Sequence, residues 1–300
     1  MGSPLRRQLH RWSRILHTAT WRSVAIAVVQ RRLLGLSCEM AYNAMLAIFP
    51  GIIAILTAIG TLRPSETVFL KLAERMSLLA PEQAMNLITA FVQEIRVPRE
   101  NPFFSLGFLI ALAIASSAIG AALHAMDEIH QIPQRQRRSF WRTKLVALAL
   151  TVGTIALVAV ASFLIFLSDW LLRLVLTQAD VTLSKPVLAL WRTLTWPAAL
   201  AIVAVAFGLL YRYGPSRWRR GTPLIPGAAV GALLWAATSA AFRLYVANFA
   251  YYNRIYGAVG AVIVLLLWLN LSSFALLVGA QVNVSLRQEL SPASARSSSP

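Results

Sequence analysis

The residues best suited to binding a ligand are one arginine and the polar side chains that follow it. Arg243 lies inside a long apolar stretch, where inserting an arginine into a membrane costs about 2.5–3.5 kcal/mol. Tyrosines and asparagines come close after it in the chain, among them Tyr245, Asn248, Tyr252 and Tyr256. Arginine with such neighbours can bind a phosphate or carboxylate headgroup. Snorkelling of Arg243 to the membrane interface and an ordinary aromatic belt explain the same residues equally well.

Polar side chains also occur in two other apolar stretches. Asn270 and Gln281 fall on one face of the last stretch if it is helical. In an earlier stretch, Ser117 lies beside a polar face that runs from Ser116 to Asp127 and includes His124, whose charge can change near neutral pH. Both sets could line a polar path through a bundle of helices. Close packing and hydrogen bonds between helices are the simpler interpretation of both.

Proline and glycine interrupt several of these stretches. Pro50 with Gly51 predicts a kink in the first stretch, because proline leaves a backbone carbonyl without its helical partner. Gly227 and Gly231 form a G-x-x-x-G pattern, and Gly257 begins a similar pair of small residues. We expect these three glycines to lie where helices pack closely.

The chain lacks the residue patterns of common catalytic sites. Its four histidines do not have the spacing of a catalytic metal site, and no nucleophile elbow, P-loop or dinucleotide fingerprint is present. A single cysteine, Cys38, excludes an internal disulfide. We therefore expect no enzyme activity, no metal and no cofactor.

The elements that position these residues are predicted to be membrane-spanning helices. The 300 residues are 58% hydrophobic and 13% charged, against about 25% charged in soluble domains. No apolar stretch shows the two-residue alternation of a barrel strand. The expected fold is an all-α integral membrane bundle of six helices, at about residues 40–62, 103–123, 145–167, 190–211, 224–246 and 256–280.

The distribution of charge predicts the orientation of the bundle. The net charge is +17, and eighteen of the 28 basic residues fall on one side of the expected spans against nine on the other. The positive-inside rule then places both termini in the cytoplasm. Most of the charge is therefore a topology signal, and we expect no nucleic-acid partner.

Three segments flank or connect the expected spans. Residues 1–39 form a basic arm in which residues 5–19 could make an amphipathic helix on anionic inner-leaflet lipids or a solvated arm. Residues 63–102 predict two short amphipathic helices on the outer side. Residues 286–300 predict a disordered tail, since serine, proline and alanine dominate there.

Several motifs in order along the chain resemble those of the YihY/BrkB family of bacterial inner-membrane proteins, formerly described as ribonuclease BN. The motifs are Ala41-Tyr42-Asn43-Ala44-Met45-Leu46-Ala47-Ile48-Phe49-Pro50, Ser116-Ser117-Ala118, Ser139-Phe140-Trp141-Arg142, Tyr211-Arg212-Tyr213-Gly214-Pro215, Tyr245-Val246-Ala247-Asn248-Phe249, Tyr256-Gly257-Ala258-Val259-Gly260-Ala261-Val262-Ile263, Trp268-Leu269 and Gly279-Ala280-Gln281-Val282-Asn283. The resemblance implies six spans, cytoplasmic termini and the inner membrane. Many relatives carry an acidic residue in place of Gln281 and tyrosine in place of Asn270, so a proton-coupled role does not carry over.

These observations favour a multi-pass transporter or flippase-like protein for an amphiphilic or anionic, lipid-like substrate. In this hypothesis Arg243 and the nearby tyrosines receive the headgroup, and Asn270 and Gln281 continue a polar path. The alternative is a membrane scaffold that recruits partners, and a membrane ribonuclease is the least favoured reading. The expected partners are membrane lipids, with homo-oligomerisation left open.

Overall fold

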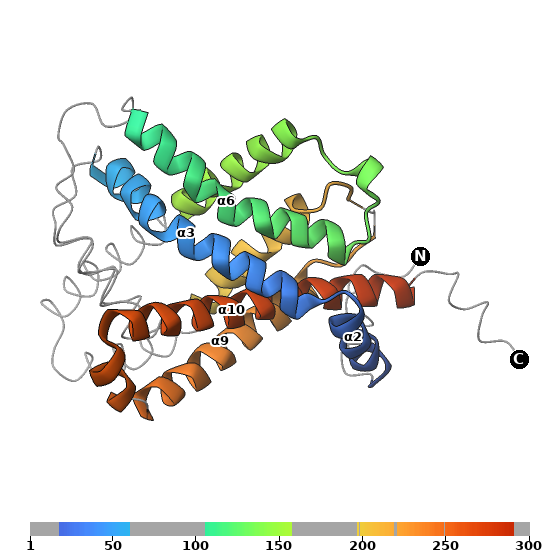
Figure 1. Cartoon of the computed structure of the whole chain (residues 1–300). Coiled ribbons are helices and arrows are strands. Elements are labelled where there is room, and N and C mark those ends of the chain that lie inside the picture. Colours follow the sequence, from blue (N-terminus) through green and yellow to red (C-terminus); the bar gives the residue numbers. More distant parts are fainter. Residues whose placement is uncertain are drawn as a thin grey trace, which may run out of the picture.

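Every regular element in the described part of the chain is a helix. The computed structural model describes residues 18–60, 106–157, 197, 199–218, 221–248 and 250–290. Figure 1 shows the helices side by side. In chain order they are α2 (Thr18–Gln30), α3 (Leu33–Gly60), α6 (Leu106–Ile129), the short 3-10 helix η2 (Gln134–Gln136), helices Phe140–Leu157 and Ala199–Tyr213, α9 (Ile225–Asn248) and α10 (Ala250–Leu290).

Five of these helices are long and apolar enough to cross a membrane. Their apolar segments are Leu33–Ile52, Leu109–Ile129, Phe140–Leu157, Ile225–Val246 and Val259–Gln288. Each overlaps one of the six expected spans, with ends that differ by up to about ten residues. The expected fourth span corresponds to Ala199–Tyr213, an apolar helix whose described part is shorter than the other five. The all-α character is thus confirmed for the described residues, with five candidate spans, and the count of six spans and the orientation of the termini stay predictions.

The ends of the elements differ from the expected boundaries. α3 begins at Leu33, ahead of the expected start at residue 40, and α2 precedes it as a separate helix that sequence reasoning did not predict. α3 also continues through Pro50, although proline has no amide hydrogen to donate within the helix. α10 extends to Leu290, into the segment expected to be disordered. The expected helices in residues 63–102, and nearly all of the one in residues 5–19, lie outside the described residues.

The helices form an antiparallel bundle in which α10 is the central element. α10 packs against α9, α3, α2 and α6, while α3 packs against α6 as well. Two hydrogen bonds show that α9 and α10 run in opposite directions. The Gly227 amide of α9 donates to Asn283 of α10, and further along α9 Ser239 accepts from the earlier α10 residue Trp268. The fully buried Leu33, Met126 and Leu277 bring α3, α6 and α10 together in one apolar core. Burial of this apolar core holds the three helices together, and it thereby sets the positions of the polar side chains that they carry.

α9 and α10 are joined by close backbone contact and paired polar groups. A Cβ added to Gly227 would overlap the Gly279 carbonyl oxygen, so only glycine permits this approach. The Asn283 side chain accepts a 2.7 Å hydrogen bond from the Gly227 amide and donates to the Leu224 carbonyl at 3.3 Å, so it caps the first turn of α9. Further along, Trp235 donates to Ser272 at 3.1 Å. The predicted packing role of Gly227 agrees with this geometry.

The loops at one end of the bundle are held by charged side chains. Asp127, at the end of α6, accepts hydrogen bonds of 2.6 Å from both the amide and the hydroxyl of Ser216. Arg138 donates to three successive backbone carbonyls, of Tyr213, Gly214 and Pro215, at 2.8–3.0 Å. The Tyr213-Gly214-Pro215 part of the motif in the family resemblance therefore supplies the backbone carbonyls that bind Arg138.

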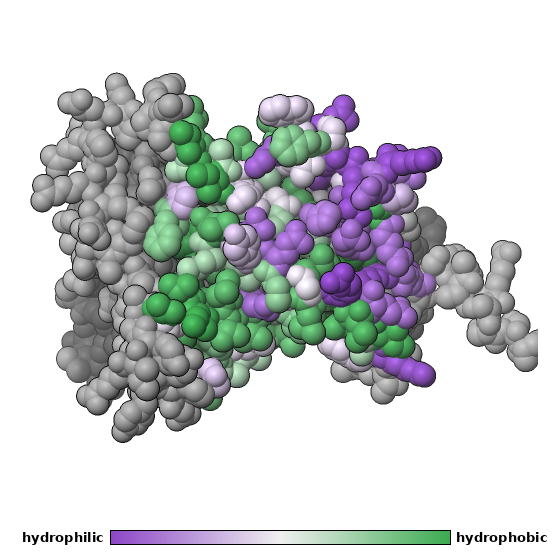
Figure 2. Space-filling view, viewed as in Figure 1, coloured by the Kyte–Doolittle hydropathy of each residue, from purple (hydrophilic) through white to green (hydrophobic). Residues whose placement is uncertain are grey.

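We call this the basic end of the bundle. It comprises α2, the turn at residues 31–32, the loop segments at residues 130–139, 214–218 and 221–224, and the C-terminal part of α10. Its described residues include Arg22, Arg31, Arg32, Arg135, Arg137, Arg138, Arg212 and Arg217. On the face that Figure 2 shows, hydrophilic side chains gather at this end, and hydrophobic side chains cover much of the rest of the coloured surface. This segregation suits a bundle whose apolar flank faces lipid.

Candidate functional site

A polar junction centred on Arg31 joins three helices at the basic end. Arg31 lies in the turn between α2 and α3, and its Nη1 donates to the backbone carbonyl of Ile129 and, at 2.9 Å, to the Gln281 Oε1. Ile129 is the last residue of α6, so the guanidinium meets the negative end of that helix dipole. Gln281 of α10 is 1% exposed and donates from Nε2 to Ser285 at 3.1 Å. We call Arg31, Gln281 and the Ile129 carbonyl the Arg31 junction.

The backbone at this junction adopts an uncommon conformation. Arg32 and Gln131 have φ of 51°, and they are the only non-glycine residues with positive φ in the described chain. Arg32 follows the end of α2 and Gln131 follows the end of α6, and the Arg32 amide donates to the Val29 carbonyl at 3.1 Å. A left-handed residue after a helix reverses the chain and satisfies the last carbonyls. Glycine is preferred there, so each reversal carries a conformational cost next to the junction.

The electrostatics of the junction leave a net positive charge. Partial burial lowers the pKa of Arg31, but an arginine stays protonated at neutral pH. His130 is 7% exposed, and its Nδ1 lies 2.9 Å from the Met126 carbonyl. Burial lowers the pKa of His130, and the nearby cations Arg287 and Arg31 lower it further against the opposing effects of the Met126 hydrogen bond and Asp127. A neutral His130 therefore adds no charge to the arginines at pH 7.

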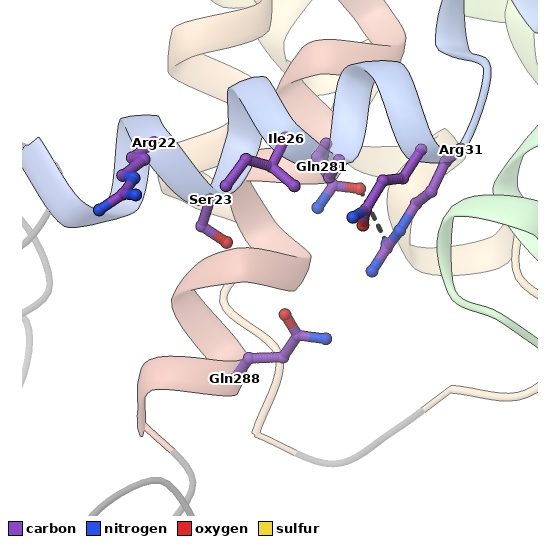
Figure 3. Close-up of a pocket in the computed structure, with 8 residues that line it drawn as sticks. Arg22, Ser23, Ile26, Arg31, Gln281 and Gln288 are labelled. Carbon is purple, nitrogen blue, oxygen red and sulfur yellow. Dashed lines mark hydrogen bonds between the residues drawn. The ribbon is translucent and has the colours of Figure 1, made fainter. Parts of the chain in front are cut away.

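Two cavities open on either side of Arg31. The larger, of about 660 Å³, lies between α2 and the C-terminal part of α10 (Figure 3). Its lining residues are Arg22, Ser23, Ile26, Ala27, Gln30, Arg31, Gln281 and Gln288. The smaller, of about 340 Å³, is lined by Gln30, Arg31, Glu128, Gln131, Ile132, Pro133 and Arg137. Gln30 and Arg31 thus belong to the walls of both cavities.

Of the two predicted amides on α10, one enters the junction and the other lies further along the same helix. Asn270 accepts a 3.1 Å hydrogen bond from Ser37 of α3, and its Nδ2 lies 2.9 Å from the Cys38 Sγ. Residues eleven apart return to nearly the same helical face, so Asn270 and Gln281 both face the α2–α3 segment. Asn270 thus makes an interhelical hydrogen bond of the kind that sequence analysis favoured, whereas Gln281 bonds to Arg31 in the turn between α2 and α3 and to Ser285 of its own helix.

The other predicted polar residues are separated from this site. Arg243 is half-buried in α9, and Tyr245 is 50% exposed with its ring stacked on Phe242 at 6.0 Å. Ser117 is half-buried in α6, and the exposed His124 lies 4.0 Å from Glu128. None of these four predicted residues lines either cavity. The side chains of Asn248, Tyr252 and Tyr256 lie outside the described part of the structure.

The predicted packing residues differ in how tightly they are enclosed. A Cβ on Gly231 would lie 2.8 Å from the Tyr211 hydroxyl, whereas one on Gly51 would meet only Ala115 at an ordinary 3.9 Å. The Tyr211 hydroxyl donates to the Leu276 carbonyl at 2.7 Å, so it occupies the space that Gly231 leaves. Gly257 falls within α10, in the part where only the backbone is described.

The chemistry available at the junction is anion binding. In the described residues, no three His, Cys, Asp or Glu side chains are grouped so that they could hold a metal ion. The junction instead offers a fixed guanidinium and the neutral amide of Gln281 beside two openings. These groups donate hydrogen bonds to a negatively charged oxygen.

Comparison with known proteins identifies the family. A family model described as "Virulence factor BrkB" matches residues 26–299. The chain belongs to the BrkB family. The ribonuclease-like protein YfkH of Bacillus subtilis (strain 168) is 28% identical over 252 residues, which cover 84% of this chain and 89% of YfkH. No solved structure matches this BrkB-family chain.

Other relatives in this family are named as membrane proteins. The UPF0761 membrane proteins of Xanthomonas oryzae pv. oryzae (strain PXO99A) and Xanthomonas campestris pv. campestris (strain 8004) are each 33% identical over 138 residues. The match covers 42% of this chain and 32% of each relative, so the aligned region spans about a third of those longer proteins. The resemblance drawn from the ordered motifs is confirmed, and the BrkB-family chain is a membrane protein with several apolar helices.

Sequence reasoning missed Arg31 as a site residue. It counted Arg31 with the basic arm, because the residue precedes the first expected span. The signal that could have found it is the Arg31–Arg32 pair directly before an apolar run, flanked by the short apolar segment at residues 24–29. Two basic residues between two apolar segments are typical of a tight connection between helices at the membrane surface.

Proposed function

We propose that this BrkB-family protein is a bacterial inner-membrane transporter or flippase-like protein for an amphiphilic or anionic, lipid-like substrate. The observation that carries the proposal is the Arg31 junction. A guanidinium on a wall shared by two cavities offers an anion a binding position that can be reached from either opening. The positive-inside rule places this basic end in the cytoplasm.

Support for a path comes from the polar face of α10. Gln281 at the junction and Asn270 further along the helix both face the α2–α3 segment, and the buried Ser273 lies between them in the chain. At 1.5 Å per residue the two amides are roughly 16 Å apart along the axis, about half of the hydrocarbon thickness. In our proposal, Arg243 with Tyr245 forms the headgroup-binding position toward the other end of the bundle.

A reconstituted transport assay tests the proposal. The full chain is placed in vesicles with fluorescently labelled phosphatidylglycerol or phosphatidylcholine, with and without a proton gradient, and dithionite quenching reports movement between leaflets. We expect movement of the anionic lipid, and Arg31→Gln to slow it about tenfold, because the charge-assisted contact is lost. Arg135→Gln is the matched control, since Arg135 is an exposed arginine in η2 outside both cavities.

Two outcomes would count against this function. Equal rates of lipid transport by the wild type and Arg31→Gln would show that the Arg31 junction takes no part in transport. A correctly folded wild type that moves neither lipid under any condition would favour the non-transport scaffold instead.

A further inference from the structure

We propose that the larger cavity is a binding site for the phosphate headgroup of an anionic membrane lipid. The phosphate oxygens would contact Arg31, and the glycerol and the first part of the acyl chains would lie along Ile26 and Ala27. This inference rests on the proposed function and deepens it, because it names the class of substrate and where it binds.

The first step of the argument is the unused edge of Arg31. Both hydrogen bonds within the described structure are donated by Nη1, to Ile129 and to Gln281. Nε and Nη2 make no described hydrogen bond, and together they form the edge of the guanidinium that binds two oxygens at once. The two bonds at Nη1 orient the group without occupying that edge.

The second step is the charge of the cavity lining. The described lining of the larger cavity contains Arg22 and Arg31 and no carboxylate. The smaller cavity is lined by Glu128, which accepts a 2.8 Å hydrogen bond from Arg137. Part of the positive charge of the smaller cavity is therefore already neutralised. The larger cavity is therefore the better site for an anion, and the side-chain amides of Gln30 and Gln288 add neutral donors.

The third step distinguishes a lipid from free phosphate. Ile26, which lines the cavity, is 45% exposed, and Trp21 and Val29 of the same helix are 41% and 77% exposed. α2 is held against α10 by its buried Val24, which packs against Val282 and Leu286. A helix that exposes apolar side chains beside arginines is typical of the membrane interface. A volume of about 660 Å³ is also within the usual range of ligand sites and larger than a phosphate ion needs.

Binding can be measured without transport. The full-length protein in detergent is mixed with phosphatidylglycerol, phosphatidic acid or phosphatidylcholine, and bound lipid is counted by native mass spectrometry. Inorganic phosphate and glycerol 3-phosphate serve as competitors. We expect the two anionic lipids to bind, and Arg31→Gln to weaken their binding about tenfold or more.

Two further variants keep the test decisive. Arg22 is exposed and makes no described hydrogen bond, so Arg22→Gln should fold normally and weaken anionic-lipid binding by a few-fold. Arg135→Gln, outside the cavity, should bind as the wild type does. If Arg31→Gln does not fold, Arg22→Gln against Arg135→Gln decides the question.

Three outcomes would overturn the site. Wild-type binding by the Arg22 and Arg31 variants would exclude the cavity, and equal losses in all three variants would indicate general attraction to the basic end. Displacement of the lipid by inorganic phosphate at similar concentration would replace the lipid with free phosphate as the ligand. If lipid binding is lost with Arg31→Gln while the wild type moves no lipid between leaflets, the binding site stands and the transport function falls.

Discussion

Replacing Gly227 with alanine should separate α9 from α10 and lower the free energy of unfolding by about 2–4 kcal/mol. The new Cβ would overlap the Gly279 carbonyl oxygen and the Asn283 carboxamide. A backbone carbonyl cannot move alone, so the two helices must separate by roughly 1 Å to restore van der Waals contact. Overpacking contributes about 1–3 kcal/mol. Stretching the 2.7 Å bond from the Gly227 amide to Asn283 adds about 1 kcal/mol.

The assay is unfolding by SDS in mixed micelles, followed by the fluorescence of the nine tryptophans. Gly208→Ala is the matched control, because a Cβ at Gly208 meets no atom within 4 Å. The control should be as stable as the wild type or slightly more stable, since alanine favours a helix over glycine. If Gly227→Ala unfolds at the wild-type SDS fraction, α9 and α10 do not approach closely at this glycine and the packing argument is refuted.

Three further predictions concern single positions. The pKa of His130 in the folded protein lies below the ordinary value of 6.5, so the unfolded chain binds a proton first as the pH falls. The thermal midpoint of unfolding should therefore drop from about pH 6.5 downward. His130→Gln should make this drop smaller, and an unchanged dependence on pH would contradict the burial argument. Arg32→Gly should raise the free energy of unfolding by up to about 1 kcal/mol in the SDS assay, because glycine adopts φ of 51° without strain, whereas a loss would show that the Arg32 side chain stabilises the fold. A double-mutant cycle with Trp235→Phe and Ser272→Ala should give a coupling of about 0.6–1.7 kcal/mol for their 3.1 Å hydrogen bond, and no coupling would mean that the bond does not form.

Hydropathy and helical periodicity were enough to predict the bundle, because long apolar runs depend only on local composition. They could not predict α2, whose apolar segment at residues 24–29 is too short to span a bilayer. Its position depends on Val24 packing against Val282 and Leu286 of α10. The start of α3 was misplaced for a related reason. Leu33 is fully buried by α6 and α10, and no local signal separates it from the basic residues before it.

The sequence also predicts part of the close contacts between helices. Small residues four apart predicted packing at Gly227 and Gly231, and both face atoms that exclude a larger side chain. The residues that face these glycines could not be predicted from the sequence, because they depend on the rotation of one helix about its axis relative to the next. Asn283 caps the first turn of α9 from the neighbouring helix, and a cap supplied by another helix leaves no local pattern in the sequence.

The two arginines show most clearly where sequence reasoning reaches its limit. Arg243 stood out because it interrupts an apolar run, which makes it costly wherever the helix lies. Arg31 drew no attention because it precedes its span, and it meets Gln281 across 250 residues of chain only when α2 folds back on α10. Gln281 was found because an amide in an apolar helix requires a partner. The search for that partner should therefore extend beyond the spans, to the basic residues of the turns that connect them.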